Sequence, residues 1–100
     1  AKMPSLKIEV IDLIKIVNDT INIFINEKAE IILETDYQEA LIEADKNQLS
    51  RMFINFIRNS IQANANRIVI KLKEKKIFLR SELKTMALVF LKKYKIKFLM

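Results

Sequence analysis

The most regular pattern of apolar and polar positions lies in the middle of the chain. Apolar residues recur between Leu49 and Ile61 at the spacing of helical turns, so they form a wide stripe along one side of a helix. Asp45 precedes the stripe as a helix cap, and Gln48, three positions later, is placed as its capping-box partner. At the other end, Asn64 can take the left-handed backbone that glycine usually provides after a helix. The pattern therefore predicts a helix that begins after Asp45 and ends near Asn64.

Weaker patterns predict five further elements. Asp12 can cap a first helix, whose apolar periodicity runs to about Lys28. Four β-branched or alternating segments are typical of strands, namely 7–10, 30–35, 40–44 and 67–73. The order strand, helix, strand, strand, helix, strand predicts an α+β fold, a two-layer sandwich with helices on one face of a mixed sheet. Beyond Glu74 the pattern predicts no regular element.

Composition narrows the class of protein. The sequence has 100 residues, of which 51% are hydrophobic and 30% charged, as in one small folded domain rather than a disordered chain. No apolar run is long enough to predict a membrane span, and no signal-peptide pattern is present. The sequence contains no cysteine, histidine or glycine, which excludes disulfides, thiol chemistry and phosphohistidine within it. Without glycine, its turns must rely on asparagine and aspartate.

The charge is unevenly distributed. Residues 1–70 contain 8 Lys and Arg against 10 Asp and Glu, whereas residues 71–100 contain 10 against 2. A basic tail can bind nucleic acid or an anionic membrane, or it can be a solvated or aberrant extension. Its aromatic residues could stack on bases, but its many apolar residues favour a tendency to aggregate. The aromatic residues are Phe78, Phe90, Tyr94 and Phe98.

Two asparagines carry the candidate chemistry. Asn55 and Asn59 are four positions apart, so they lie on the same side of the predicted helix, beside the apolar stripe. An amide oxygen is a suitable ligand for Mg²⁺, which usually keeps several waters and bridges substrate phosphates. Arg58 adds a positive charge suited to phosphate. Spacing alone favours the simpler alternative, in which both asparagines only face solvent.

A family resemblance adds to this interpretation. Residues 47–63 resemble the N box of the ATP-binding domain of sensor histidine kinases, of the GHKL type, and Asp45 with Gln48 matches its usual lead-in. Residues 1–4, followed by a strand and Asp12, look like the linker after the dimerisation helices of NtrY-like kinases. The resemblance covers about residues 1–75. It implies an incomplete Bergerat-type ATPase fold, with a linker over 1–6 and the N-terminal part of the ATPase domain over 7–75.

The resemblance also implies roles, cofactors and partners. Asn59 matches the asparagine that coordinates Mg²⁺, and Asn55 matches one that lines the nucleotide pocket. Arg58 and Gln62 match positions near the phosphates, although many relatives have Lys or Glu in place of Gln62. Family members use ATP and Mg²⁺ to phosphorylate a histidine, and their partners are a phosphoacceptor dimerisation domain and a response regulator. The resemblance also leads us to expect a cytoplasmic location, with the parent kinase anchored in the membrane. We expect no nucleic acid partner.

The resemblance ends after the strand at 67–73. The family continues with an Asp-x-Gly-x-Gly adenine motif, a lid and a second glycine box, whereas this sequence has no glycine. Residues 76–100 are therefore expected to be an aberrant basic and apolar tail, and ATP binding weak or absent. Codons for Lys84–Phe90, read one base earlier, permit Lys-Asp-Asn-Gly-Thr-Gly-Phe, which is the missing motif. This compatibility leads to the hypothesis of a frameshift near residues 74–77.

Overall fold

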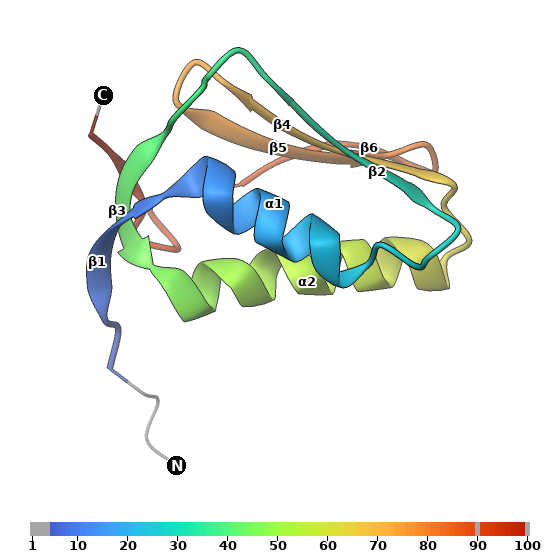
Figure 1. Ribbon diagram of the computed structural model, residues 1–100, viewed down its shortest axis with the longest axis horizontal. Helices are drawn as coiled ribbons and strands as arrows, with labels where there is room; N and C mark the ends of the chain where they lie inside the picture. The colour runs from blue at the N-terminus through green and yellow to red at the C-terminus, as the bar shows by residue number, and fades with distance from the viewer. Residues whose placement is uncertain (1–4, 90, 100) are drawn as a thin grey trace.

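The computed structural model describes residues 5–89 and 91–99, and the side chains of these residues except 84–87. The predicted linker over 1–6 and Phe90 thus lie largely or wholly outside the described residues. The fold is α+β, as predicted, and all six predicted elements are present (Figure 1). In chain order the elements are β1 (Ile8–Asp12), α1 (Leu13–Ile23), β2 (Glu30–Thr35), β3 (Leu41–Asp45), α2 (Lys46–Gln62), β4 (Arg67–Lys73), β5 (Lys76–Ser81), β6 (Lys84–Leu88) and β7 (Lys97–Phe98).

The strands form two sheets rather than one. The larger sheet has the order β2-β4-β5-β6 and is mixed, because β2 and β4 run parallel while β4, β5 and β6 run antiparallel to their neighbours. The smaller sheet has the order β1-β3-β7 and is antiparallel. Figure 1 shows both helices on one side of the larger sheet, with the smaller sheet at one end of the molecule.

The core lies between the helices and the larger sheet. Alternate residues of β4 and β5 point inward and meet the apolar stripe of α2, and burying one such side chain contributes about 1.5–3 kcal/mol. No helix of the described residues has the length and apolar character needed to cross a membrane. The largest side chains of the core with less than 2% exposure are Phe53, Leu13, Ile42, Leu49, Ile57, Ile68, Ile70, Leu72 and Ile77.

Both helices begin at the predicted caps. The Asp12 carboxylate accepts a hydrogen bond from the Ile14 N–H at 3.0 Å, and it also accepts one from Ala40 N–H at 3.2 Å. The Asp45 carboxylate accepts one from Gln48 N–H at 3.0 Å. The capping box is only half formed, however, because the buried Gln48 Oε1 has no hydrogen-bond partner among the described residues.

The C-terminal end of α2 also follows its prediction. Asn64 has a φ of 66°, in the left-handed region. Its N–H bonds to the Ile61 carbonyl at 2.9 Å, and the Ala65 N–H bonds to the Ser60 carbonyl at 3.0 Å. These two bonds are those of a Schellman motif, here built around asparagine instead of glycine.

The end of α1 and the last strands differ from the elements that the sequence pattern predicts. The helix ends at Ile23 rather than near Lys28, with Phe24 as its C-cap, and the chain then reverses to begin β2. After β4, the positive φ angles of Glu74 (55°) and Lys75 (57°) make a two-residue hairpin turn into β5. The strand β5 buries Ile77 in the core, so regular structure continues past residue 75.

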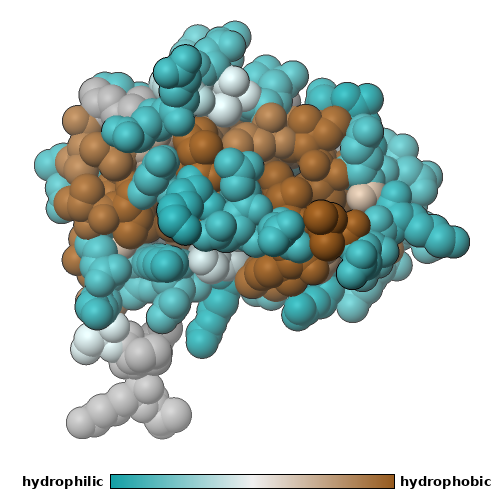
Figure 2. All heavy atoms as spheres, in the orientation of Figure 1, coloured by the Kyte–Doolittle hydropathy of each residue, from teal (hydrophilic) through white to brown (hydrophobic). Residues whose placement is uncertain are grey.

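The smaller sheet leaves apolar side chains on its outer surface. Val10 is 63% exposed, and Ile8 on the same strand is 42% exposed. Leu41 and Leu99, from β3 and the end of β7, are also exposed there. In Figure 2 the brown, hydrophobic surface at this end of the molecule lies over β1 and β3.

Candidate functional site

The four predicted site residues share the solvent side of α2. Asn55, Arg58, Asn59 and Gln62 are all exposed, whereas Phe53 on the same helix is fully buried. The helix is held in this orientation by its apolar stripe, which packs into the core. The structure therefore brings the four positions together on one surface, as their spacing predicts.

The two asparagines adjoin the border of the apolar stripe. Met52 and Phe56 are half-buried, and each precedes an asparagine by three positions, so it is that asparagine's neighbour on the helix surface. Ser60, the residue after Asn59, is buried and donates a hydrogen bond to the Phe56 carbonyl at 2.8 Å. Asn55 and Asn59 thus lie on a well-anchored part of the helix, although their own side chains are open to solvent.

The donor groups on this surface suit a magnesium–phosphate ligand. Each asparagine offers one neutral amide oxygen, and Mg²⁺ takes few protein ligands when waters and phosphate oxygens complete its coordination. Arg58 joins none of the ion pairs formed among the described residues, so its charge is available to an anion. These groups come from one side only, since all four belong to a single helix.

The N-terminal end of α2 is fixed by a second contact of its cap. Besides the Gln48 N–H, the Asp45 carboxylate accepts a hydrogen bond from Lys7 N–H at 2.8 Å, which ties the chain before β1 to the helix. The Gln48 and Lys7 N–H groups, in that order, lower the pKa of Asp45 below its usual 3.8, and the Asn47 N–H and the charge of Arg51 add to this. The carboxylate is therefore charged at neutral pH.

Three hollows of the described surface are lined by other residues. One lies at the end of α1, between Asn22 and Ile31, and one lies beside Glu34 and Lys71 at the ends of β2 and β4. The third is lined by Asp12, among others, at the start of α1. None of the three includes a predicted site residue, and the four predicted site residues are exposed on the surface of α2.

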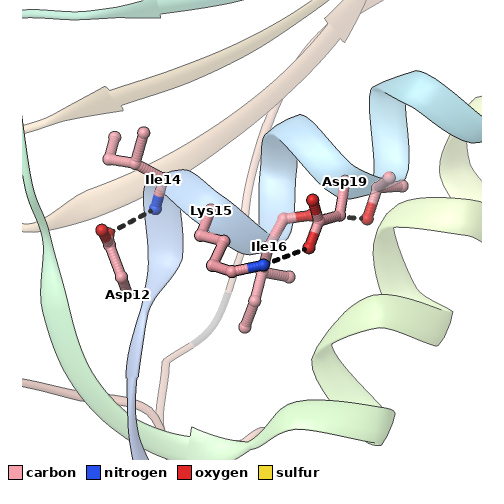
Figure 3. A network of polar contacts seen from close by, with 6 residues as sticks. Asp12, Ile14, Lys15, Ile16 and Asp19 are labelled. Carbon is pink, nitrogen blue, oxygen red and sulfur yellow. Dashed lines mark hydrogen bonds and ion pairs between the residues drawn. The ribbon is translucent and has the colours of Figure 1, made fainter.

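The hollow at the start of α1 contains a local polar network (Figure 3). Asp12 caps the helix there, and the Lys15 ammonium pairs with the Asp19 carboxylate at 3.1 Å. The pair spans one turn of the helix and is exposed, so it contributes little to stability. The Asp12 cap explains where the helix starts.

A likeness to known proteins is found only in the fold. Neither a protein-family model nor a curated protein matches the sequence. Among solved structures, the chain is similar to a nucleotide-free form of the catalytic domain of the histidine kinase ThkA, with a TM-score of 0.61 and 18% sequence identity. The match covers 74% of this chain and 56% of that one, so the chain spans little more than half the length of its structural neighbour. The chain therefore has part of the fold of a histidine-kinase catalytic domain.

Proposed function

We propose that this chain is the asparagine-bearing part of the ATP-binding domain of a sensor histidine kinase, of the NtrY-like kind. The observation that carries the proposal is the position of Asn55 and Asn59, which are exposed together on α2 of a fold shared with a histidine-kinase catalytic domain. The N-box resemblance of residues 47–63 supports it independently, because it was drawn from the sequence and not from the fold.

Each of the four residues has a defined role in the proposal. Asn59 holds Mg²⁺ through its amide oxygen, and Asn55 contacts the nucleotide one turn earlier. Arg58 and Gln62 approach the phosphates from the same side. The metal neutralises phosphate charge, and phosphoryl transfer depends mainly on such electrostatic positioning. The residues of this chain thus orient the phosphates and take no part in covalent chemistry.

The partners in the proposal lie outside this sequence. The sequence has no histidine, so the phosphorylated histidine belongs to a dimerisation domain, and a response regulator receives the phosphoryl group. The groups that bind the adenine and close over the phosphates must also come from elsewhere, since the sequence has no glycine-rich loop. We expect the chain by itself to bind ATP only weakly, and to show no autophosphorylation.

Nuclear magnetic resonance tests the site at the weak affinity expected. The ¹⁵N-labelled chain is titrated with ATP and Mg²⁺ to millimolar concentrations. Shifts should centre on residues 55–62 and should require Mg²⁺. Asn59→Ala should abolish them, whereas Asn18→Ala, an exposed asparagine of α1, should leave them unchanged. Shifts centred elsewhere, or no Mg²⁺-dependent shifts in residues 55–62, would rule the site out.

The gene tests the frameshift hypothesis separately. A frame shifted by one base behind Lys84–Phe90 should encode Asp-x-Gly-x-Gly, followed by further sequence typical of the family. Sequencing from codon 70 past the stop reads this directly. Met86 and Ala87 force one glycine codon in that frame, so the aspartate codon and the second glycine codon decide the test. If the shifted frame lacks either of them, residues 76–100 are the authentic continuation of the chain.

A further inference from the structure

The larger sheet has a second face, opposite the helices, which the proposed ATP site does not involve. Along β4, the fully buried Ile68 and Ile70 point to the core, so by alternation their neighbours point outward. The same holds on β5, where Ile77 and Leu79 point inward. We call the outward surface the open sheet face. Its members on the two central strands are Arg67, Val69, Lys71, Lys73, Lys76, Phe78 and Arg80.

The strand register brings positive charges together on the open sheet face. Val69 lies opposite Arg80, Lys71 opposite Phe78, and Lys73 opposite Lys76. Facing residues on neighbouring antiparallel strands have Cβ atoms about 4.5–5.5 Å apart. Lys73 and Lys76 are therefore two like charges in direct opposition, an arrangement that disfavours the sheet. An anion lying over the pair would relieve this repulsion.

The carboxylates nearby neutralise only part of this charge. The strand β2 contributes Glu30 and Glu34, whose side chains pair with Arg67 at 3.6 Å and with Lys71 at 3.8 Å. The remaining cations of the face, Lys73, Lys76 and Arg80, are exposed and join none of the ion pairs among the described residues. Lys73 and Lys76 lie at the turn that joins β4 to β5, and Arg80 lies near the other end of β5, so these three cations are available to an anion that lies along the strands.

An aromatic ring lies among these cations. Phe78 is half-buried, with Lys71 opposite it and Arg80 two positions along the same strand. Val69, the other apolar residue of the open sheet face on β4 and β5, is only 5% exposed. Leu88, 44% exposed, lies beside Phe78 on β6. A ring set among separate cations can stack on a base while the cations contact phosphates, so this face suits a ligand with both phosphates and flat bases.

We propose that the open sheet face binds single-stranded nucleic acid, with phosphates on Lys73, Lys76 and Arg80 and one base stacked on Phe78. The face is independent of Asn55 and Asn59, which lie in the helix layer. The sequence alone left nucleic-acid binding by the basic tail as an alternative and favoured aggregation, because the tail also has many apolar residues. Folding as strands separates the basic from the apolar residues, since alternation sends the isoleucines and leucines inward and the cations outward.

Fluorescence anisotropy with a labelled single-stranded oligonucleotide of mixed sequence tests the proposal. With three phosphate contacts, a plot of the logarithm of the association constant against the logarithm of the salt concentration should have a slope of roughly −2. Arg80→Gln should make this slope shallower by about 0.7. Lys46→Gln removes an exposed lysine at the start of α2, in the helix layer, and it should leave the slope unchanged.

The base contact needs its own variants. Phe78→Ala should weaken binding roughly tenfold to a hundredfold, because stacking of one base is lost. Phe78→Tyr keeps an aromatic ring and should retain the affinity, which separates stacking from any loss of folding. Circular dichroism of each variant confirms the fold.

Three results would overturn the proposal. Oligonucleotide binding that is unchanged by both Arg80→Gln and Phe78→Ala would place the contact elsewhere. Equal affinity for a duplex, unaffected by Phe78→Ala, would indicate a polyanion contact without base recognition. Tighter binding to phosphatidylserine vesicles than to the oligonucleotide would indicate a membrane surface instead.

Discussion

The helix layer and the sheet layer each present a polar face to solvent, and the two faces are built differently. The helix face holds Asn55, Arg58, Asn59 and Gln62, which are mostly neutral amides from one element. The open sheet face draws its cations from two neighbouring strands whose register sets their spacing. A single helix can cover one side of a ligand only, whereas adjacent strands form a continuous surface. The helix face therefore needs other segments to bind a nucleotide tightly, and the open sheet face does not need them to bind an extended polyanion.

Both faces depend on the core between them, and removing its largest side chain should have the largest effect. Phe53 is fully buried on α2, so Phe53→Ala should lower the free energy of unfolding by about 3–5 kcal/mol. Urea denaturation followed by circular dichroism measures this. Phe78→Ala is the matched control. Because Phe78 is only half-buried, this variant should lose less of the free energy of unfolding. Equal losses at the two positions would mean that the open sheet face is not solvent-exposed.

The second largest effect on stability is expected at Asp45, the cap that begins α2. Asp45→Ala removes the acceptor of both the Gln48 and the Lys7 N–H groups, so the melting temperature should fall, though by less than for Phe53→Ala. Because folding lowers the pKa of Asp45, its contribution is fully present above the usual value of 3.8 and is lost as the pH falls through the lowered pKa.

The pH dependence distinguishes the cap from a general effect of the substitution. Melting temperatures of the original chain and of Asp45→Ala should differ at neutral pH and converge in acid. Asp19→Ala removes an exposed ion pair with Lys15 on α1, so it should change the melting temperature little at either pH. A difference that persists at low pH would show that the Asp45 charge is not the cause.

The turn that sets the register of the open sheet face should be improvable. Glu74 and Lys75 both have positive φ, which side chains disfavour, and asparagine followed by glycine is the preferred pair in such a turn. Replacing them with Asn-Gly should raise the free energy of unfolding by about 1 kcal/mol. The oligonucleotide affinity should stay the same, because neither residue belongs to the open sheet face. Unchanged or reduced stability would mean that β4 and β5 do not pair through this turn.

The smallest effect on stability is expected at the candidate magnesium ligand. Asn59→Ala removes an exposed side chain from a helix, so the free energy of unfolding should change by less than about 0.5 kcal/mol. Because alanine has a higher helix propensity than asparagine, we expect this change to be a small increase. Ser60→Ala, one residue on, is the contrast, because it removes a buried hydroxyl that bonds to the Phe56 carbonyl. A large loss at Asn59 would assign it a structural role.

Local patterns predicted the parts of the fold that local physics controls. The sequence predicted the caps at Asp12 and Asp45 and the left-handed Asn64, because the backbone groups at helix ends find their hydrogen-bond partners within a few residues. The half-formed capping box was not, since Gln48 matches the motif while its amide finds no partner. The end of α1 was misplaced because Phe24 and Ile25 continue the apolar periodicity, and only the tertiary structure shows that the chain reverses there to begin β2.

The sequence by itself determined which side of each early element is apolar, where α2 begins and ends, and that Asn55 and Asn59 share a surface. The tertiary structure alone decided that the strands divide into two sheets and that β5 and β6 extend the larger one. It also decided which cations become neighbours. The physical reason is the range of the interactions: periodicity and capping act within a few residues, whereas strand partners and register depend on contacts between distant segments that compete for the same core.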